Sequence, residues 1–208
     1  MVFHTVPYVV QKLFPKRIWS KTPDKNQVYL TFDDGPVPGI TDYVLNELAK
    51  RNMKATFFMV GDNVGKYPLL AREVNSEDHG VANHTFHHLN GWKTGKNEYL
   101  NDFFKCDKMI QEVLGKKTYL FRPPYGLMTS SQAIGVLKTH SIVMWNMLSG
   151  DYDLSLKPQD ILKKSIEKTG PGSIVLFHDQ QKTSSVLPKI LPTYLDEIRD
   201  KGWKTATL

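Results

Sequence analysis

Residues Gln27–Pro36 read QVYLTFDDGP, and this stretch decides the fold prediction. Its first six residues are rich in β-branched and aromatic side chains, which favours a β-strand. The Asp-Asp-Gly-Pro that follows is typical of a turn. Apolar residues then recur at helical spacing from Ile40 to Leu48, and a second short apolar run follows at Ala55–Val60. The stretch therefore predicts a strand, a helix and a second strand in succession.

The same alternation continues to the end of the chain without internal repeats or a low-complexity linker. About seven β-α units result, which indicates one α/β domain with a mainly parallel sheet. A full eight-unit barrel typically takes about 250 residues, and the chain has 208. We therefore predict a distorted (β/α)7 barrel that resembles a TIM barrel. An open doubly wound sheet is the alternative, but the first turn lacks a glycine-rich phosphate loop. Later strands are predicted near 80–82, 119–121, 141–146, 172–177 and 203–207, with helices near 68–75, 100–114, 131–139, 158–168 and 190–201.

The composition is that of an ordinary globular protein, with 40% hydrophobic and 23% charged residues. Cys106 is the single cysteine, so the chain cannot form an internal disulfide or a multi-cysteine metal site. A metal would need His and carboxylate ligands. Cys106 shares a predicted helical face with Phe103 and Ile110, which favours a buried structural thiol. The net charge of +6 permits a polyanionic partner without naming one.

The first 26 residues are predicted to form an N-terminal arm ahead of a domain at 27–208. No secretory signal pattern and no apolar stretch of about 18 residues is seen, which predicts a cytoplasmic protein. The segment Tyr8–Lys21 mixes apolar and basic residues, a pattern compatible with peripheral contact with an anionic membrane surface. Pro15 interrupts any long amphipathic helix there, which favours instead an arm that packs on the domain.

Ionisable side chains gather where the predicted strands end. In parallel α/β folds the functional groups lie on loops at the carboxyl ends of the strands, so these residues are expected to meet on one face of the barrel. Five of the seven predicted strands end in this way. The residues concerned are Asp33, Asp34, His84, His87, His88, Arg122, Asp151, His178 and Asp179.

A metal site is predicted from Asp34, His84 and His88. Histidines four residues apart lie on one face of a helical turn and can converge on a metal. Two imidazoles and one carboxylate make a three-ligand site with an open position, which is typical of catalytic zinc. The same ligands also suit cobalt, nickel or iron. Taken singly, the aspartates are equally good turn residues and the histidines equally good surface or core residues.

The remaining strand-end residues acquire roles beside such a metal. A metal-bound water is acidified and can attack a carbonyl, and Asp33, which adjoins a metal ligand, is the natural base. A nearby cation such as Arg122 would keep Asp33 ionised. His178 can protonate the leaving group, because imidazole titrates near working pH. The alternatives are a structural salt bridge for Arg122 and a hydrogen-bonded buried histidine at 178.

Four segments occur in the order of a known set of motifs. TFDDGP at 31–36, HTFHH at 84–88, RPPY at 122–125 and LFH at 176–178 resemble the first, second, third and fifth motifs of one family. The family is the polysaccharide deacetylases, also called carbohydrate esterase family four or the NodB homology domain. The resemblance covers about Gln27 to Leu208 and implies a distorted barrel with about seven strands.

The resemblance also implies roles for single residues. Asp33 would be the catalytic base, and Asp34 with the outer histidines of the second motif would hold the metal. Arg122 would orient the base, and the backbone N–H at Tyr125 would bind the oxyanion. Leu176 would line the acetyl pocket, and His178 would be the general acid.

The fourth motif departs from the family pattern. Trp145 is followed by Leu148, where the family commonly has Asp, and then by Asp151 and Tyr152. Asp151 falls where the family's aspartate contacts the arginine of the third motif, and Tyr152 can supply an aromatic wall to the pocket. The loss of a carboxylate at 148 affects the shape and polarity of the substrate pocket more than the hydrolytic step. Trp92, in the loop after the second motif, is expected either to stack on a sugar ring or to pack its loop.

The combined prediction is a metal-dependent deacetylase of an N-acetylated glycan containing N-acetylglucosamine, such as peptidoglycan or a chitooligosaccharide, with zinc as the first expectation. The alternatives are a hydrolase of O-acetyl esters, such as acetylated xylan, or of a small cyclic amide. A silent glycan binder or a nucleic-acid binder is disfavoured, because the base and all three ligands are present and no basic-aromatic motif is seen. The family usually acts outside the cytoplasm on wall polymers, which conflicts with the missing export signal.

Overall fold

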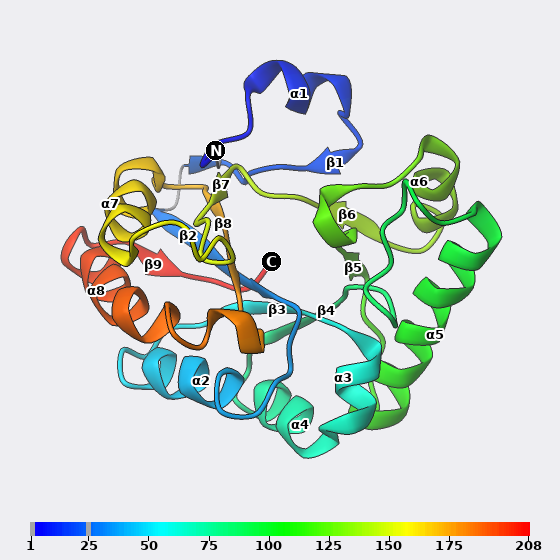
Figure 1. The fold of residues 1–208 in the computed structure, drawn as a ribbon, viewed down its shortest axis with the longest axis horizontal. Helices are drawn as coiled ribbons and strands as arrows, with labels where there is room; N and C mark the ends of the chain where they lie inside the picture. The colour runs from blue at the N-terminus through cyan, green and yellow to red at the C-terminus, as the bar shows by residue number, and fades with distance from the viewer. Residues whose placement is uncertain (1–2, 24–25) are drawn as a thin grey trace.

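The structure is a computed structural model that describes residues 3–23 and 26–208. Within this part of the chain, nine β-strands form one curled sheet with eight α-helices around it (Figure 1). All the strand pairs in it are parallel, which confirms the predicted distorted barrel. The strands are β1 (Arg17–Ile18), β2 (Gln27–Asp33), β3 (Thr56–Met59), β4 (Gly80–Asn83), β5 (Leu120–Phe121), β6 (Ser141–Val143), β7 (Met147–Leu148), β8 (Ile174–His178) and β9 (Lys204–Thr205). The helices are α1 (Tyr8–Leu13), α2 (Thr41–Ala49), α3 (Gly61–Lys66), α4 (Pro68–Ser76), α5 (Lys96–Leu114), α6 (Ser130–Val136), α7 (Pro158–Lys168) and α8 (Leu187–Asp200).

The N-terminal arm is part of the barrel. The strands follow the order β1-β6-β5-β4-β3-β2-β8-β7, so β1 and β7 lie at the two edges of the sheet. Thr5 forms an antiparallel bridge with Met147 of β7, while Arg17 of β1 pairs with Ile142 of β6. The arm therefore spans from one edge to the other (Figure 1). Strand β1 thus belongs to the sheet, although a two-residue strand leaves no alternating pattern in the sequence. The division into an arm of 26 residues and a domain at 27–208 stays a prediction.

The strand predicted at 141–146 is corrected: β6 ends at Val143, and a separate strand, β7, begins only at Met147. The chain leaves the sheet between them, where the guanidinium of Arg122 donates a hydrogen bond of 2.8 Å to the carbonyl oxygen of Met144. An apolar run of this length predicts one strand. Nothing in the run indicates that a distant side chain will hydrogen-bond to one of its carbonyl oxygens.

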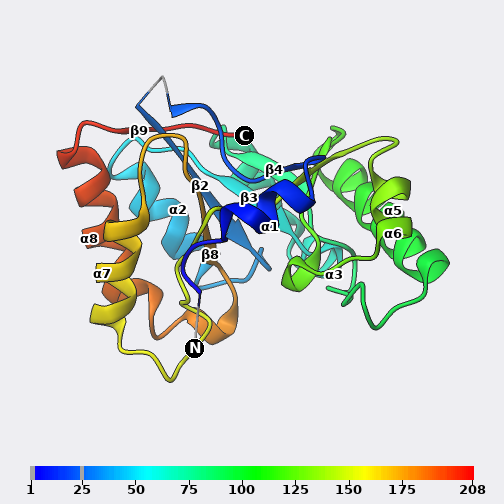
Figure 2. The same cartoon turned by 90° about the horizontal axis from the view of Figure 1, so that it is seen from above.

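Most of the core lies between the strands and the surrounding helices. Phe32 of β2 stacks on Phe57 of β3 and on Phe177 of β8, with ring centroids 5.3 and 5.9 Å apart. Helices α7 and α8 flank the strands on one side and α5 and α6 on the other (Figure 2). None of the helices in the described residues is long and apolar enough to cross a membrane. With both flanks covered, the carboxyl ends of the strands are left to build a site.

Candidate active site

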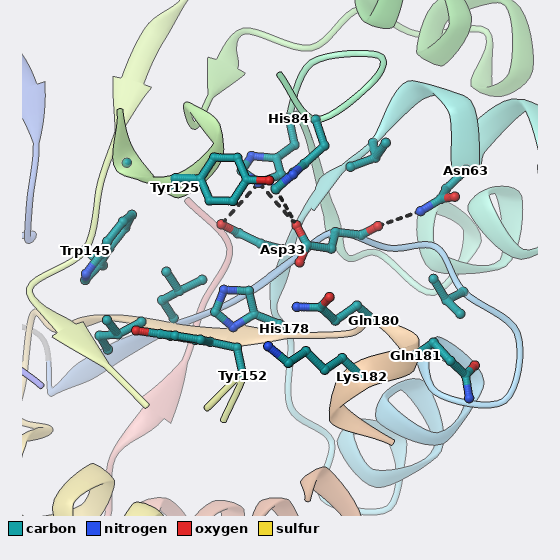
Figure 3. Close-up of a pocket in the computed structure, with 17 residues that line it drawn as sticks. Asp33, Asn63, His84, Tyr125, Trp145, Tyr152, His178, Gln180, Gln181 and Lys182 are labelled. Carbon is teal, nitrogen blue, oxygen red and sulfur yellow. Dashed lines mark hydrogen bonds and ion pairs between the residues drawn. The ribbon is translucent and has the colours of Figure 1, made fainter. Parts of the chain in front are cut away.

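The pocket lies where β2, β4, β5 and β8 end. Asp33 at the end of β2 is in register with His178 at the end of β8, and Asp34 follows it directly. His84 comes one residue after β4, and Arg122 one residue after β5. Parallel pairing thus brings together side chains that are up to 145 residues apart in the sequence, as the strand-end argument predicts (Figure 3).

The Asp-Asp-Gly-Pro turn is held by Asp179, a residue that the sequence reasoning gave no role. Its carboxylate accepts hydrogen bonds from the Gly35 N–H at 3.1 Å and from the Thr41 hydroxyl at 2.6 Å. A Cβ atom at Gly35 would meet that carboxylate at 2.0 Å, so only glycine fits there. Burial raises the pKa of Asp179 well above its usual range. Asp179 therefore fixes the backbone that presents Asp33 and Asp34.

Asp34 has a backbone conformation that is unusual for a non-glycine residue, with φ at 83°. The side-chain amide of Asn63 donates a hydrogen bond of 2.7 Å to the carbonyl oxygen of Asp34, and the N–H of Asp34 donates one of 3.2 Å to Phe58. Strained residues of this kind persist only where their surroundings hold them, and they cluster at functional sites.

Asp34, His84 and His88 form a group in which one ligand atom from each residue lies within 4.8 Å of the others. The Nε2 atoms of His88 and His84 are 3.0 and 3.4 Å from Asp34 Oδ1. This buried oxygen has no hydrogen-bond partner among the described residues, which fits a cation as its missing partner. Burial would raise the pKa of Asp34, but the two imidazoles outweigh it and hold that pKa well below its usual range.

The histidines converge, although not through a helical turn as the spacing argument supposed. Residues 84–88 form an irregular loop, in which Thr85 and His88 have positive φ angles of 61° and 55°. Nδ1 of His84 lies 2.7 Å from the Arg122 carbonyl oxygen, so Nδ1 carries the proton and Nε2 is free to bind a metal. His87 points elsewhere and pairs with Asp102. The residues present therefore fit a divalent metal.

Arg122 and Asp33 form a buried ion pair. The guanidinium of Arg122 has no exposed surface and donates a hydrogen bond of 2.6 Å to Asp33 Oδ1. It also donates to the Thr31 hydroxyl at 2.8 Å, and its plane lies over the Phe58 ring, 4.0 Å from the centroid. A charge-assisted bond of this kind fixes a carboxylate in one orientation, which suits a base.

His178 is paired with Asp151. Nδ1 of His178 lies 2.8 Å from Asp151 Oδ1, and the His178 N–H donates a bond of 2.8 Å to Oδ2. The family pattern placed Asp151 against Arg122, and this expectation is corrected: both oxygens of Asp151 serve His178, while Ser149 donates to Oδ1. Burial alone would lower the pKa of His178, but Asp151 outweighs it and raises the pKa to about 9. The imidazolium form suits a general acid at neutral pH.

A cavity of about 650 Å³ opens beside these groups. Tyr152 packs edge-on against the His178 ring, and Tyr125 does the same against His88. Trp92 does not line this cavity and is 69% exposed, so the structure does not bring it to the other site residues. Sequence reasoning gave no role to Gln180 and Lys182, which follow β8 without a motif. Further lining residues include Asn63, Trp145, Leu148, Leu176 and Gln181.

Cys106 lies away from the cavity, on α5. Its side chain has no exposed surface, which confirms the buried thiol expected from its helical position. Burial raises its pKa far above the usual value for a thiol. Cys106 is therefore a core residue and not a nucleophile.

The fold and the site define a class: a parallel α/β barrel with an Asp-His-His group, a buried Arg-Asp pair and an Asp-His pair in one pocket. Residues 20–144 match the model of the family described as polysaccharide deacetylase. The chain belongs to this polysaccharide deacetylase family.

Two relatives and one solved structure illustrate the similarity. A peptidoglycan-N-acetylglucosamine deacetylase of Bacillus cereus is 31% identical over 191 residues, which are 89% of this chain and 68% of the relative. A chitooligosaccharide deacetylase of Azorhizobium caulinodans is 30% identical over 161 residues, 76% of each chain. The solved structure of a peptidoglycan N-acetylglucosamine deacetylase, in complex with a benzamide ligand, superposes with a TM-score of 0.84 at 29% identity, covering 98% of this chain and 95% of that one.

Proposed function

We propose that the protein is a metal-dependent hydrolase that removes acetyl groups from N-acetylglucosamine units of a glycan, of the peptidoglycan or chitooligosaccharide type. The observation that carries the proposal is the grouping of three functional units in one pocket. These are a metal-ligand group, a carboxylate held by a buried arginine, and an imidazole held by a second carboxylate. The relatives named above act on such glycans, which supports the substrate class.

Asp34, His84 and His88 would hold the metal, with zinc as the first candidate. A divalent metal there would supply an acidified water and polarise the acetyl carbonyl. The donor set of two imidazoles and one carboxylate also suits cobalt, nickel or iron.

Asp33 takes a proton from the attacking water. Arg122 holds one of its carboxylate oxygens, so Oδ2 is left to face the pocket, 3.7 Å from Nε2 of His84. The hydroxyl adds to the acetyl carbon, and the backbone N–H of Tyr125 stabilises the oxygen that becomes negative. Such a donor is commonly worth about 3–4 kcal/mol of transition-state stabilisation.

His178 protonates the leaving nitrogen. Its Nδ1 is held by Asp151, so the proton leaves from Nε2. The bond between carbon and nitrogen then breaks, and the products are acetate and the free amine of glucosamine. Leu176 would contact the acetyl methyl group, while Tyr152 and Trp145 would form the walls that bind the sugar.

Acetate release from peptidoglycan and from chitooligosaccharides tests the proposal. Asp33→Asn and treatment with a chelator should each abolish the release, whereas Asp160→Asn, which alters an exposed carboxylate on α7, should leave it unchanged. Full activity of Asp33→Asn would show that Asp33 is not the base. Acetylated xylan and a cyclic imide, tested beside these glycans, decide the bond: turnover of these two alone would overturn the N-acetyl assignment.

A further inference from the structure

The loop that carries the metal-binding histidines, residues 84–88, has an unfavourable backbone. Thr85 is β-branched and yet has φ at 61°, and His88 has φ at 55°. A β-branched residue in this region is a genuine outlier. Conformations of this kind are kept only where surrounding contacts enforce them.

Asp102 of α5 holds the middle of this loop. Its Oδ2 accepts hydrogen bonds from the N–H of Phe86 at 2.8 Å and of His87 at 2.9 Å. Its Oδ1 is 2.5 Å from Nδ1 of His87. The carboxylate is only 7% exposed and therefore binds the middle of the loop with little competition from water.

Asn83 ties the start of the loop to the same helix. Its side-chain oxygen accepts a bond of 2.8 Å from the Thr85 N–H, while its amide nitrogen donates to the Phe103 carbonyl and to Asp107. From the other side, the Gly61 N–H of α3 donates a bond of 3.0 Å to the Thr85 carbonyl. Helix α5 therefore holds the loop through Asn83 and Asp102.

We propose that Asp102 is a positioning residue that sets the loop in its metal-binding shape before the metal arrives. It does not itself touch the ligand group, and its effect reaches His84 and His88 through the loop backbone. The inference rests on the proposed metal-dependent function. Removal of a residue that hydrogen-bonds directly to a metal ligand typically changes metal affinity by about 10–100-fold. Asp102 acts one step further away, so an effect near the lower end of that range is expected.

The test is the dissociation constant for zinc, measured by competition with a chromophoric chelator on the full chain. Asp102→Ala should raise this constant by about tenfold, and the absorption spectrum of the cobalt-loaded protein should broaden because the ligands are less well fixed. His87→Ala removes only the contact with Oδ1 and should have a smaller effect. Glu112→Ala, which removes an exposed carboxylate from the same helix, is the matched control and should change nothing.

Asp102→Asn keeps one carbonyl oxygen for the two backbone N–H groups and serves if Asp102→Ala does not fold. Its dissociation constant for zinc should be higher than those of the wild type and of His87→Ala, and lower than that of Asp102→Ala. Zinc affinity equal to that of the wild type in either folded Asp102 variant overturns the proposal and leaves the deacetylase assignment intact. A wild type that binds no divalent metal would instead overturn the proposed function.

The N-terminal arm carries a second, independent feature. Val6, just before α1, and Val10 on α1 pack against the core of the barrel, while Tyr8, Val9 and Leu13 of α1 are 69%, 66% and 69% exposed. Phe3 and Phe14 on either side of α1 are exposed as well, so five of the exposed large hydrophobic side chains of the described residues lie between positions 3 and 14.

The charge around this apolar surface has one sign. Residues 1–23 contain no Asp or Glu but contain Lys12, Lys16, Arg17 and Lys21. The Lys12 ammonium lies 4.8 Å from the centre of the Tyr8 ring, so charge and apolar surface are interleaved. A short helix with exposed apolar residues and flanking lysines has the character of a segment that lies in a bilayer interface.

We infer that the arm docks on an anionic lipid surface. The probe is sedimentation with vesicles of phosphatidylcholine, alone or mixed with phosphatidylglycerol. The protein should bind the anionic vesicles, more weakly as salt rises, and each of Lys12→Gln and Lys16→Gln should weaken binding by about fivefold. Leu13→Glu should abolish it, while Leu69→Glu, at an equally exposed leucine on α4, should not.

Three outcomes would overturn the inference. These are equal binding to both kinds of vesicle, equal behaviour of Leu13→Glu and Leu69→Glu, or self-association that Leu13→Glu abolishes without any binding to vesicles. Circular dichroism of the two glutamate variants shows that each compared protein is folded.

Discussion

Arg122 has no exposed surface and Asp33 only 3%, whereas Tyr125, across the same cavity, is 61% exposed. The first two belong to the inner wall, defined here as Asp33, Asp34 and His84, which line the cavity, together with Arg122, which is buried behind Asp33. The outer wall comprises Tyr125, Trp145, Tyr152 and Lys182, all of which line the cavity. Of the inner-wall side chains, Asp33, His84 and Arg122 are held by hydrogen bonds to other strands and loops. On the outer wall, Tyr125 and Tyr152 instead pack against histidine rings.

This difference between the walls matches a difference in function: the inner wall carries the reacting groups, and the outer wall binds the sugar. A base and a metal ligand must be placed within a fraction of an ångström, which requires buried and fully bonded partners. A sugar-binding wall can be partly exposed, since aromatic rings contribute area rather than a fixed proton position. Substitutions of the inner wall should therefore reduce stability and turnover, and substitutions of the outer wall should change substrate binding alone.

The largest effect is expected for Arg122→Met. It leaves the Asp33 carboxylate buried without its partner, which should cost about 3–5 kcal/mol of unfolding free energy. Chemical denaturation measures this loss, with Lys189→Met, at an exposed position on α8, as the control for the lost charge. A loss of less than about 1 kcal/mol, the range of exposed pairs, would show that the inner wall is not held as described.

Asp151→Asn should come next, through His178. Because Asp151 raises the His178 pKa to about 9, the wild-type acid keeps its proton up to that pH, and the rate should fall only as pH rises through about 9. The variant should lose activity at lower pH, and the overall rate should fall by about 10²–10⁴-fold. A pH–rate profile whose alkaline limb does not move would contradict this assignment.

The same pair makes a prediction for stability. The folded-state pKa of His178 lies above the unfolded value of about 6.5, so the stabilisation is fully present below pH 6.5 and is lost as pH rises through about 9. Unfolding free energies measured across this window should therefore decline in the wild type more than in Asp151→Asn. Parallel curves for the two proteins would remove Asp151 as the cause.

A smaller effect is expected for Tyr152→Ala on the outer wall. The variant loses one aromatic contact with the sugar, which should raise KM by about 2–10-fold and leave the thermal midpoint almost unchanged. Steady-state kinetics on a chitooligosaccharide measure this, and Tyr119→Ala, at an exposed tyrosine outside the cavity, is the control. A fall in kcat alone would place Tyr152 with the chemistry instead.

The smallest effect is expected for Lys182→Met. Among the described lining residues Lys182 brings the one ammonium group to the cavity, and its side chain extends toward Tyr152 (Figure 3). The Lys182 ammonium should lower KM for glycans that carry a carboxylate by about 2–5-fold, and this preference should weaken as salt rises. The measurement is the ratio of KM for peptidoglycan to KM for a neutral chitooligosaccharide, with Lys189→Met as the control. An unchanged ratio in Lys182→Met would contradict this role of Lys182.

The inner wall could largely be predicted from the sequence, because each residue directly follows an apolar run. The strand at Gln27–Asp33 places Asp33 and Asp34, and the strand at 172–177 was predicted to run into His178. The residues that hold the turns and loops of the site could not be predicted in the same way. Asp102, Asn63 and Asp179 occur in helices and loops without a motif, and only their position beside the turns and loops they hold reveals a role.

Partner choice was also beyond the sequence. The family pattern assigned Asp151 to Arg122, but the fold places it against His178. Strands β7 and β8 are parallel neighbours, so their carboxyl ends lie side by side. Likewise the sequence spacing placed His84 and His88 on a helical turn, whereas an irregular loop brings them together. The role of a residue depends on which groups lie near it in space. Spacing along the chain gives that distance only inside a single helix or strand.

Hydrophobic periodicity and turn residues are local properties, so the alternation of strands and helices, the barrel class and the groups at the strand ends follow from the amino-acid sequence. Three features follow only from the folded chain: the pairing of the N-terminal arm with β6 and β7, the burial of Arg122 on Asp33, and the choice of the carboxylate that holds His178. These depend on the packing of segments more than 25 residues apart, where the free energy comes from contacts that no local pattern records.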